Sequence, residues 1–238
     1  MITNLKPISR YYRSIGPEYS KIYNDREMIY LGMAHMPLII GITGPTKSGK
    51  TMVAKYLVTE HGFHYECLSS FLRERASALG YLSPNWEKMR DIAKQWRSEA
   101  GPAVLVNMLF KKLEREGILR SARSIVVDGI LHPEEFLALQ KLPNTHLIAI
   151  TSKAELRHKS IDEWAKDSPT WEEFVKRDQW ECGFREGDQK LEDEEPNINE
   201  CIRLTPEGNR FEREENESRE ELFEQVDAFL KKARVHSQ

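Results

Sequence analysis

The residues with the clearest chemical purpose form the stretch GPTKSGKT, which runs from Gly44 to Thr51. Its spacing is G-x-x-x-x-G-K-[ST], the pattern of a P-loop, which wraps the phosphates of a nucleotide. Two glycines let the backbone curl so that successive N–H groups point inward, and a helix start adds partial positive charge. The pattern predicts a nucleotide-binding loop made of Gly44, Pro45, Thr46, Lys47, Ser48, Gly49, Lys50 and Thr51.

Two side chains of this loop have individual roles in such sites. We expect Lys50 to reach the β and γ phosphates as a point charge, and Thr51 to bind Mg²⁺ through its hydroxyl. The motif is meaningful only between a strand and a helix. The apolar run LIIGIT precedes it and the segment MVAKYLV follows it, so a glycine turn with a solvated lysine is the less favoured interpretation.

A carboxylate suited to the same metal site follows another apolar run. In SIVVDGI, Asp128 closes a predicted strand, at the edge where open α/β sheets bind ligands. We therefore predict that Asp128 holds Mg²⁺ through water. The alternative interpretation is a turn or helix-cap aspartate before Gly129.

The wider pattern predicts an α/β protein with a parallel sheet, because apolar runs alternate with amphipathic segments. Capping boxes at Thr170 with Glu173 and at Ser218 with Glu221 mark two later helix starts. Other helices are expected from Leu68 to Gly80, from Ser83 and Pro84, from about Pro102 to Gly117, and from Pro133. The expected strands are LIIGIT, FHYEC, SIVVDGI, HLIAIT and, as the fifth, ECIRLT.

Composition narrows the classes of function. The 238 residues carry 35 basic and 38 acidic side chains, a net charge of -3, so there is no overall positive field for nucleic acid or membranes. Three cysteines in no paired framework suit a reducing compartment, and no run approaches the about 18 apolar residues of a membrane span. We expect a cytoplasmic protein.

Two competing site assignments are weaker. A GTPase would carry an N-K-x-D motif and a D-x-x-G switch. Neither motif occurs in this sequence, and Asp128 is followed by Gly-Ile-Leu. His61, His64 and Cys67 are spaced by three, but strand alternation would spread them over both faces. We interpret them as packing and surface residues.

The order of these pieces resembles the P-loop nucleotide kinases, specifically the archaeal-type nucleotide kinases that are similar to dephospho-CoA kinase. The resemblance runs from about Met36 to the C-terminus, on the segments GITGPTKSGKT, LSSFLRERASALG, WRSEAGPAVL, VVDGI, LIAITSKAELR, TWEEFVKRD and NESREELFEQVDAFLKK. It implies a three-layer P-loop NTPase fold with a parallel, five-stranded sheet. It also implies a helical substrate flap at about 68–117 and a lid at about 157–177.

Several site residues follow from the resemblance alone. It implies that Arg73 and Arg97 of the flap bind the acceptor, that Arg157 is the catalytic clamp at the start of the lid, and that Asn216 lies near adenine. ATP and Mg²⁺ are the implied cofactors. On amphipathic helices, Arg73 and Arg97 also fit solvated surface charges.

The sequence departs from the family at positions that matter for transfer. Ser70 stands where the flap helix of the family begins with a carboxylate that accepts the proton of the attacking hydroxyl. Leu131 stands where an arginine is expected, and Ser160 and Trp164 replace further lid arginines. Because phosphoryl transfer depends on positioning and charge neutralisation, these losses bear on rate more than on nucleotide binding.

Two functional hypotheses remain. In the first, the protein is a kinase that moves the γ-phosphate of ATP to a nucleotide-like acceptor. The intact set of Lys50, Thr51 and Asp128 favours it, with Glu66 or Glu74 as a substitute for the lost carboxylate. In the second, the P-loop serves a nucleotide-binding regulatory module with feeble transfer or none.

Two segments outside the predicted core suit protein partners. Residues 1–35 form an N-terminal extension, in which tyrosines alternate with basic residues, ahead of a P-loop domain at 36–238. An acidic insertion lies at about 186–200. The regulatory hypothesis uses both segments as partner surfaces.

Overall fold

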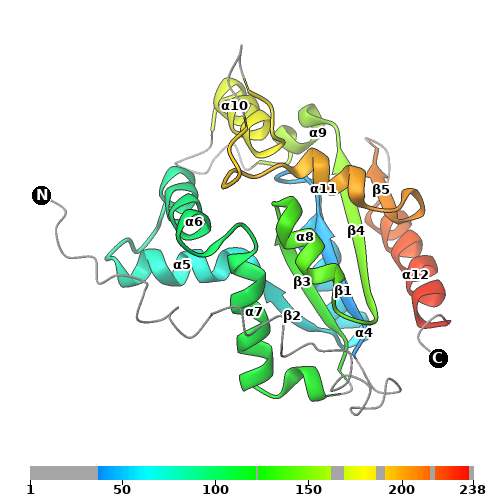
Figure 1. The fold of residues 1–238 in the computed structure, drawn as a ribbon. Helices are drawn as coiled ribbons and strands as arrows, with labels where there is room; N and C mark the ends of the chain where they lie inside the picture. The colour runs from blue at the N-terminus through cyan, green and yellow to red at the C-terminus, as the bar shows by residue number, and fades with distance from the viewer. Residues whose placement is uncertain (1–36, 122, 162–168, 186–190, 215–217, 236–238) are drawn as a thin grey trace, which may run out of the picture.

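A five-stranded parallel sheet forms the centre of the protein in the computed structural model (Figure 1). The structure describes residues 37–121, 123–161, 169–185, 191–214 and 218–235. The strand order is β2-β3-β1-β4-β5, and every neighbouring pair is parallel. The strands are β1 (Ile39–Thr43), β2 (His64–Cys67), β3 (Ile125–Ile130), β4 (Thr145–Ser152) and β5 (Arg210–Arg213). The predicted α/β fold with five parallel strands is confirmed.

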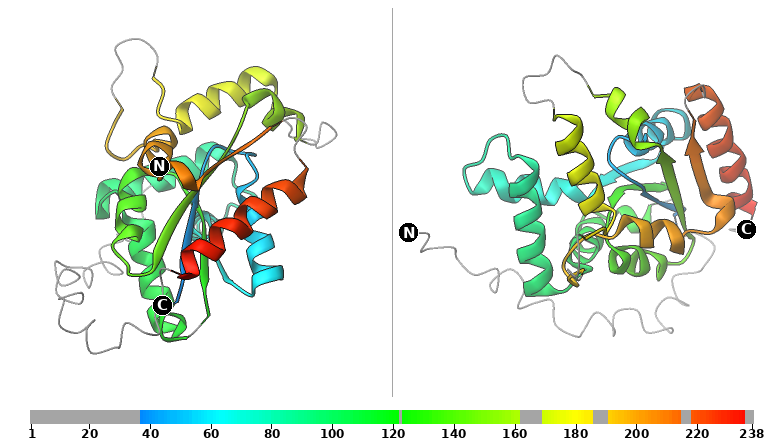
Figure 2. Two further views of the ribbon diagram at one scale, coloured as in Figure 1. Left: turned by 90° about the vertical axis from the view of Figure 1, so that its right-hand side faces the viewer. Right: turned by 90° about the horizontal axis from the view of Figure 1, so that it is seen from above.

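Strand alternation divides the core into two layers of side chains. From β1, Ile40 and Ile42 pack with α4 (Lys50–His61) and α12 (Arg219–Val235). Ile39 points to the opposite face, which is covered mainly by α7 (Val104–Arg115) and α8 (Pro133–Gln140). Figure 2 shows these helices on the two sides of the sheet. Both faces are therefore buried, as near-continuous apolar strands require.

The remaining helices surround the carboxyl edge of the sheet. Of the predicted flap at about 68–117, α5 (Leu68–Ala78) and α6 (Trp86–Ala100) extend to one side of the sheet, whereas α7 packs on its face. The helices α9 (Ala154–Lys159) and α10 (Trp171–Glu181) lie above the edge of the sheet (Figure 1). The predicted capping box starts α10: Thr170 Oγ1 accepts from the Glu173 N–H, and the Glu173 carboxylate accepts from the Thr170 N–H. This arrangement brings α6 and α10 next to the loop that follows β1.

The fifth strand was predicted in the wrong place. ECIRLT lies in α11 (Ile198–Leu204), and the fifth strand is β5, a few residues later. The side chain of Asn197 accepts a hydrogen bond from the Glu200 N–H at 3.0 Å and so starts the helix. Ile198 and Cys201, three residues apart, are the buried side chains of α11, a helical spacing that the short apolar run did not reveal.

Two other boundaries differ slightly from the prediction. The helix expected at Ser83 and Pro84 begins at Trp86, because Asn85 is its N-cap. Asp128 does not end its strand, since β3 continues for two residues to Ile130. The N-terminal extension, 1–35, lies outside the described residues, as do 186–190 of the acidic insertion.

No helix in the described ranges is both long enough and apolar enough to cross a membrane.

The start of α8 depends on a neutral histidine. His132 Nδ1 accepts from the Glu134 N–H at 3.1 Å, and His132 Nε2 donates to the Asp193 carbonyl at 2.7 Å. Burial lowers the pKa of His132 below its usual 6.5, with a further lowering by Arg97. Protonation would remove the acceptor at the helix start.

This histidine predicts a stability loss in acid. Because the folded pKa is lowered, the contribution is complete above about pH 6.5 and is lost as the pH falls toward the folded pKa. We expect a decrease of about 1 kcal/mol, the usual value of a helix cap. Urea unfolding between about pH 7.5 and pH 5 measures it, with His132→Asn as the control that keeps an acceptor without titrating. Equal pH slopes in both proteins would contradict the assignment.

Candidate functional site

The loop between β1 and α4 has the curled backbone that its sequence predicts. Gly44 has φ 137°, and a Cβ built on it would lie 2.0 Å from the carbonyl oxygen of Ile150 on β4, so no larger residue fits. Gly49 has φ 108° and is the N-cap of α4. The Ser48 N–H donates to the Pro45 carbonyl at 3.2 Å. The P-loop therefore ends at a helix N-terminus that favours anions.

Two buried oxygens at this loop lack a hydrogen-bond partner within the described part of the chain. They are Ser48 Oγ and Asp128 Oδ1, on residues that are 0% and 3% exposed. An unpaired buried oxygen costs roughly 1–3 kcal/mol, so such atoms call for a ligand or ion that completes them. Their position at the P-loop fits a phosphate group and a metal ion.

Lys50 extends across the loop from the first turn of α4. Its Nζ donates to the Pro45 carbonyl oxygen at 2.6 Å. Burial lowers the pKa of Lys50, and the nearby carboxylates of Asp128 and Glu181 oppose this effect. A phosphate oxygen is a stronger partner for the ammonium than a carbonyl, so the position suits the role predicted for Lys50.

Thr51 and Asp128 meet directly beside the loop. Thr51 Oγ1 donates to Asp128 Oδ2 at 2.8 Å, because β1 leads into α4 and pairs with β3 at Ile42 and Asp128. The Tyr65 hydroxyl donates to the same oxygen at 3.2 Å. The pairing of β1 with β3 thus places the Thr51 hydroxyl beside the Asp128 carboxylate, the two groups predicted to bind the metal. Tyr65 was missed, although its place on β2, two residues before the partner of Asp128, could have indicated it.

The donors beside the loop fit Mg²⁺ better than a metal with an all-protein coordination shell. Thr51 and Asp128 offer hard oxygen atoms, and Asp128 Oδ1 is unpaired. Mg²⁺ keeps several waters and takes few protein ligands beside substrate phosphates. Within the described ranges, no group of three or more histidines, cysteines or carboxylates is placed to hold a metal. His61 pairs with Asp227 and His64 with Glu66.

Arg157 anchors the loop instead of projecting into open space. Its guanidinium forms a two-pronged ion pair with Asp178 of α10, at 2.5 and 2.7 Å. It also donates to the carbonyls of Thr46 and Ser152, at 3.0 and 2.9 Å, and is 5% exposed. The predicted clamp on a transferred phosphate is thus engaged with the protein, where it joins α9, α10 and the P-loop.

The two flap arginines lie in different environments. Arg97 is 5% exposed and pairs with the fully buried Glu135 at 2.8 Å. The alternative interpretation of Arg97 as a solvated surface charge is therefore wrong, and its predicted acceptor-binding role stays a prediction. Arg73 is exposed and lies at the carboxyl end of β2, where it donates to Ser69 Oγ at 2.8 Å and to Cys67 Sγ at 3.6 Å. Asn216 lies outside the described residues.

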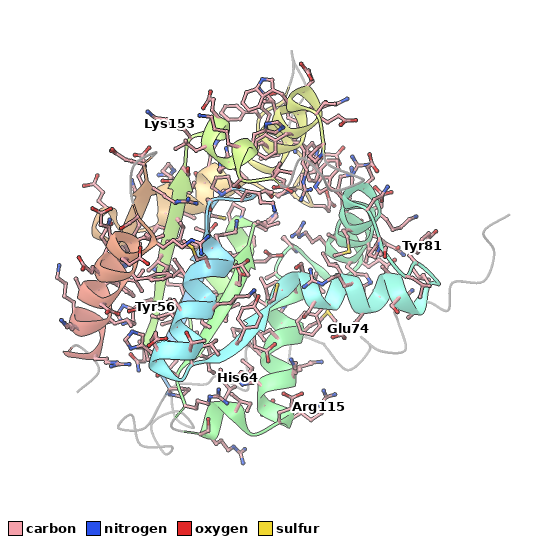
Figure 3. The ribbon with its side chains drawn as sticks, turned by 180° about the vertical axis from the view of Figure 1, so that it is seen from behind. Tyr56, His64, Glu74, Tyr81, Arg115 and Lys153 are labelled. Atoms are coloured by element: carbon pink, nitrogen blue, oxygen red, sulfur yellow. The ribbon has the colours of Figure 1, made fainter. Side chains whose placement is uncertain are left out.

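The carboxylates suggested near Ser70 do not reach the loop. Both oxygens of the buried Glu66 accept from Lys112 Nζ at 2.8 Å. Glu74 is exposed on α5, a helix that leads away from the sheet (Figure 3). Ser70 Oγ donates to the Cys67 carbonyl at 2.7 Å. Glu66 is therefore excluded as a replacement for the missing family carboxylate.

A different carboxylate touches the P-loop. Glu181 Oε2 accepts from Thr46 Oγ1 at 2.6 Å. Glu181 Oε1 accepts from Trp86 Nε1 of α6 and from Arg177 Nε, both at 3.0 Å. The prediction from sequence missed this contact, because it depends on how α10 packs. The available signal was the three-residue spacing of Asp178 and Glu181, which places both on one helix face.

A cavity of about 540 Å³ lies between α4 and α12, and Thr51 is one of its lining residues. Tyr56 lies on α4, where that helix faces α12 (Figure 3). Its ring is parallel to that of Phe223, with 4.0 Å between the centroids. The cavity is lined by Thr51, Met52, Lys55, Tyr56, Thr59, Glu60, Arg219 and Phe223. It offers an aromatic surface next to the helix start that follows the P-loop.

The parallel sheet and the loop between β1 and α4 define a P-loop NTPase fold. The structure is similar to a protein of Chloroflexus aurantiacus that is assigned as a kinase, with a TM-score of 0.51 and 17% identity over 84% of this chain and 98% of that one. At that identity the likeness shows the fold alone.

The sequence comparisons show the family. The chain is 30% identical over 156 residues to a UPF0200 protein of Pyrococcus abyssi, which covers 63% of this chain and 81% of the relative. A UPF0200 protein of Hyperthermus butylicus is 28% identical over 149 residues, covering 62% and 77%. The chain belongs to the UPF0200 family. A scan against protein-family models finds no match.

The accessibility of the three cysteines tests how the residues around the site are packed. Cys182 and Cys201 are 8% and 0% exposed, and burial raises the pKa of both thiols, that of Cys182 to about 12. Cys67 is partly exposed beside Arg73. We expect a thiol reagent to label Cys67 alone in the native protein and all three cysteines in denaturant. Intact-mass spectrometry counts the labels, with Cys67→Ser as the control. Rapid native labelling of Cys182 would contradict this site geometry.

Proposed function

We propose that this protein is a Mg²⁺-dependent kinase that transfers the γ-phosphate of ATP to a small acceptor. The observation that carries the proposal is the contact of Thr51 with Asp128 beside a curled P-loop, with Ser48 Oγ and Asp128 Oδ1 left for a ligand. In a glycine turn that binds no ligand, the free-energy cost of burying these two unpaired oxygens would not be offset. The resemblance to dephospho-CoA kinase and the nucleotide kinases suggests a nucleotide-like acceptor.

In this proposal the P-loop residues divide the work. The backbone N–H groups between Gly44 and Gly49 bind phosphate oxygens, and Lys50 neutralises charge on the β and γ phosphates. Thr51 and Asp128 hold Mg²⁺, which supplies further charge neutralisation when bound. Arg157 positions the loop through the carbonyl of Thr46. Because these contacts exist before the ligand binds, ordering the loop on binding costs less conformational entropy.

The cavity between α4 and α12 suits the nucleoside part of ATP. Its lining includes Thr51, the predicted metal ligand, and Phe223. Asn216, for which the resemblance implies a place near adenine, precedes Arg219 of this cavity by three residues. Tyr56 and Phe223 offer the aromatic surface on which a base stacks.

The acceptor then enters from the flap side. Arg73 lies there with Cys67 and Ser69, at the end of β2 next to Asp128. An exposed guanidinium at this edge suits an acceptor that carries a phosphate or carboxylate. Arg97 is not included among the acceptor-binding residues of this proposal, because Glu135 occupies its guanidinium.

Lys50→Ala tests the nucleotide site. Loss of a charge that contacts phosphate should weaken ATP·Mg²⁺ binding by about 30-fold, or about 2 kcal/mol. Calorimetric titration measures the affinity, and ADP formation measures turnover. Lys141→Ala is the matched control, because Lys141 is exposed at the far end of α8. Unchanged ATP affinity in Lys50→Ala would refute the assignment of the P-loop.

Phe223→Ala tests the base site. We expect ATP to bind about 10-fold more weakly, the effect of losing one stacking ring, whereas inorganic tripolyphosphate should bind as it does to the wild type. Competitive titration compares the two ligands. Phe184→Ala is the control, because Phe184 is 61% exposed on another part of the surface. Equal weakening for both ligands would show that the cavity does not hold the base.

The acceptor is identified by a panel of dephospho-CoA, nucleosides and nucleoside monophosphates, each with ATP and Mg²⁺. Acceptor-dependent ADP release supports the kinase. ATP binding at micromolar affinity without any acceptor-dependent release would favour the regulatory module instead, in line with the departures at Ser70 and Leu131.

A further inference from the structure

A kinase that acts on a hydroxyl needs a group to accept its proton, and Ser70 cannot do so. Three carboxylates lie around the P-loop in the described structure. Asp128 is held by Thr51 and Tyr65 in the metal site. Asp178 is bound through both oxygens to Arg157. Glu181 is the third.

Glu181 has one oxygen suited to a further partner. Its Oε1 accepts two hydrogen bonds, from Trp86 and Arg177, which fix the carboxylate group. Its Oε2 accepts only the Thr46 hydroxyl among the described contacts. A carboxylate oxygen accepts at about two lone-pair positions, so Oε2 keeps a position for one more donor. Glu181 is 3% exposed, which keeps bulk water from competing for it.

The position of Glu181 is on the acceptor side of the proposed nucleotide. The proposed base cavity lies between α4 and α12, and Thr51 and Phe223 are among the residues that line it. Glu181 contacts the loop at Thr46, which is not among the cavity-lining residues, and it also contacts Trp86 of the flap helix α6. A triphosphate that runs from the cavity along the P-loop ends near Thr46. Its terminal phosphate therefore faces Glu181 and the flap.

Positive charges near Glu181 reduce the electrostatic repulsion between its carboxylate and a bound phosphate. Arg177 pairs with it, and Arg177 also lies over the Trp86 ring at 5.5 Å. The Glu181 carboxylate also opposes the lowering of the Lys50 pKa by burial. Two cations thus offset the repulsion that phosphate and carboxylate would otherwise experience.

We propose that Glu181 is the catalytic base of this protein and that the acceptor presents a hydroxyl group. This inference rests on the proposed kinase function. Glu181 Oε2 takes the proton of the acceptor O–H, and the acceptor oxygen forms a bond to the γ-phosphorus of ATP. The bond between that phosphorus and the β–γ bridging oxygen breaks, and ADP leaves with the electron pair. The products are the phosphorylated acceptor, ADP and one proton on Glu181.

The proposal narrows the substrate class within the panel described above. A hydroxyl acceptor has a proton to lose, so its transfer depends on a base. A phosphate acceptor is already ionised at neutral pH and needs none. Dephospho-CoA and nucleosides should therefore be acceptors that depend on Glu181, whereas nucleoside monophosphates acting through their phosphate should not.

The experiment compares the wild type with Glu181→Gln, Glu181→Asp and Glu74→Gln. The measured quantities are ATP·Mg²⁺ affinity, thermal unfolding without ligand, and ADP formation with each hydroxyl acceptor and with water alone. We expect Glu181→Gln to lower turnover by about 100-fold or more, with ATP affinity within about threefold of the wild type. Glu181→Asp, which keeps a carboxylate, should recover part of the turnover. Glu74→Gln should behave as the wild type.

A pH profile separates a base from a merely structural residue. Wild-type kcat should fall on the acid side as the base takes up a proton, and this fall should be absent from Glu181→Gln. The proposal is overturned if Glu181→Gln turns over as fast as the wild type. It is also overturned if kcat of this variant falls at low pH as it does in the wild type.

Three further outcomes are informative. If Glu181→Gln melts much earlier or loses ATP binding in parallel with turnover, Glu181 is a structural latch and the proposal is overturned. If the wild type binds ATP but forms no ADP even with water, a base role is likewise overturned. If the wild type fails to bind ATP at all, the proposed function itself has failed, which the titration reveals before any turnover is measured.

Discussion

The close packing of the P-loop against two neighbouring strands is the constraint on which the site depends. Gly44 lies against the carbonyl of Ile150 on β4, with no room for a Cβ. On the other side, Thr51 donates to Asp128 on β3. Because β1 stands between β3 and β4 in the sheet, both contacts follow from the strand order. The buried sheet thus sets the shape of the loop, and the loop sets the position of Lys50 and the helix N-terminus.

The parts of the site that were predictable from sequence are those encoded locally. The P-loop has a fixed spacing, and apolar runs on both faces of a buried sheet mark β1, β3 and β4 without reference to the rest of the chain. Asp128 was predictable because parallel strands end at a common edge. The fifth strand was not: β5 has only four residues, and Phe211 alone is buried. The more apolar ECIRLT fits the strand pattern better, although Asn197 caps it as a helix.

Side-chain roles that depend on tertiary packing were beyond sequence reasoning. The resemblance implies that Arg97 binds the acceptor, yet in the structure Arg97 forms a buried ion pair with Glu135 of α8. Removing one member of such a buried pair leaves an uncompensated charge, so the pair is held together. The same limit hid Glu181, whose partners Thr46 and Trp86 are 135 and 95 residues away in sequence. Neither pairing has a short-range pattern.

The electrostatics of the loop explain why its carboxylates are tolerated beside a site for polyanions. Each is held by donors: Asp178 by Arg157, Asp128 by Thr51 and Tyr65, and Glu181 by Thr46, Trp86 and Arg177. Burying a carboxylate costs less when such hydrogen bonds favour its charged form. Asp178 serves to fix Arg157, and Asp128 has an oxygen open toward a metal. Glu181 neither fixes a buried arginine nor faces the metal residues. Under the proposed function, the charge of this buried carboxylate serves to take the proton of the acceptor hydroxyl.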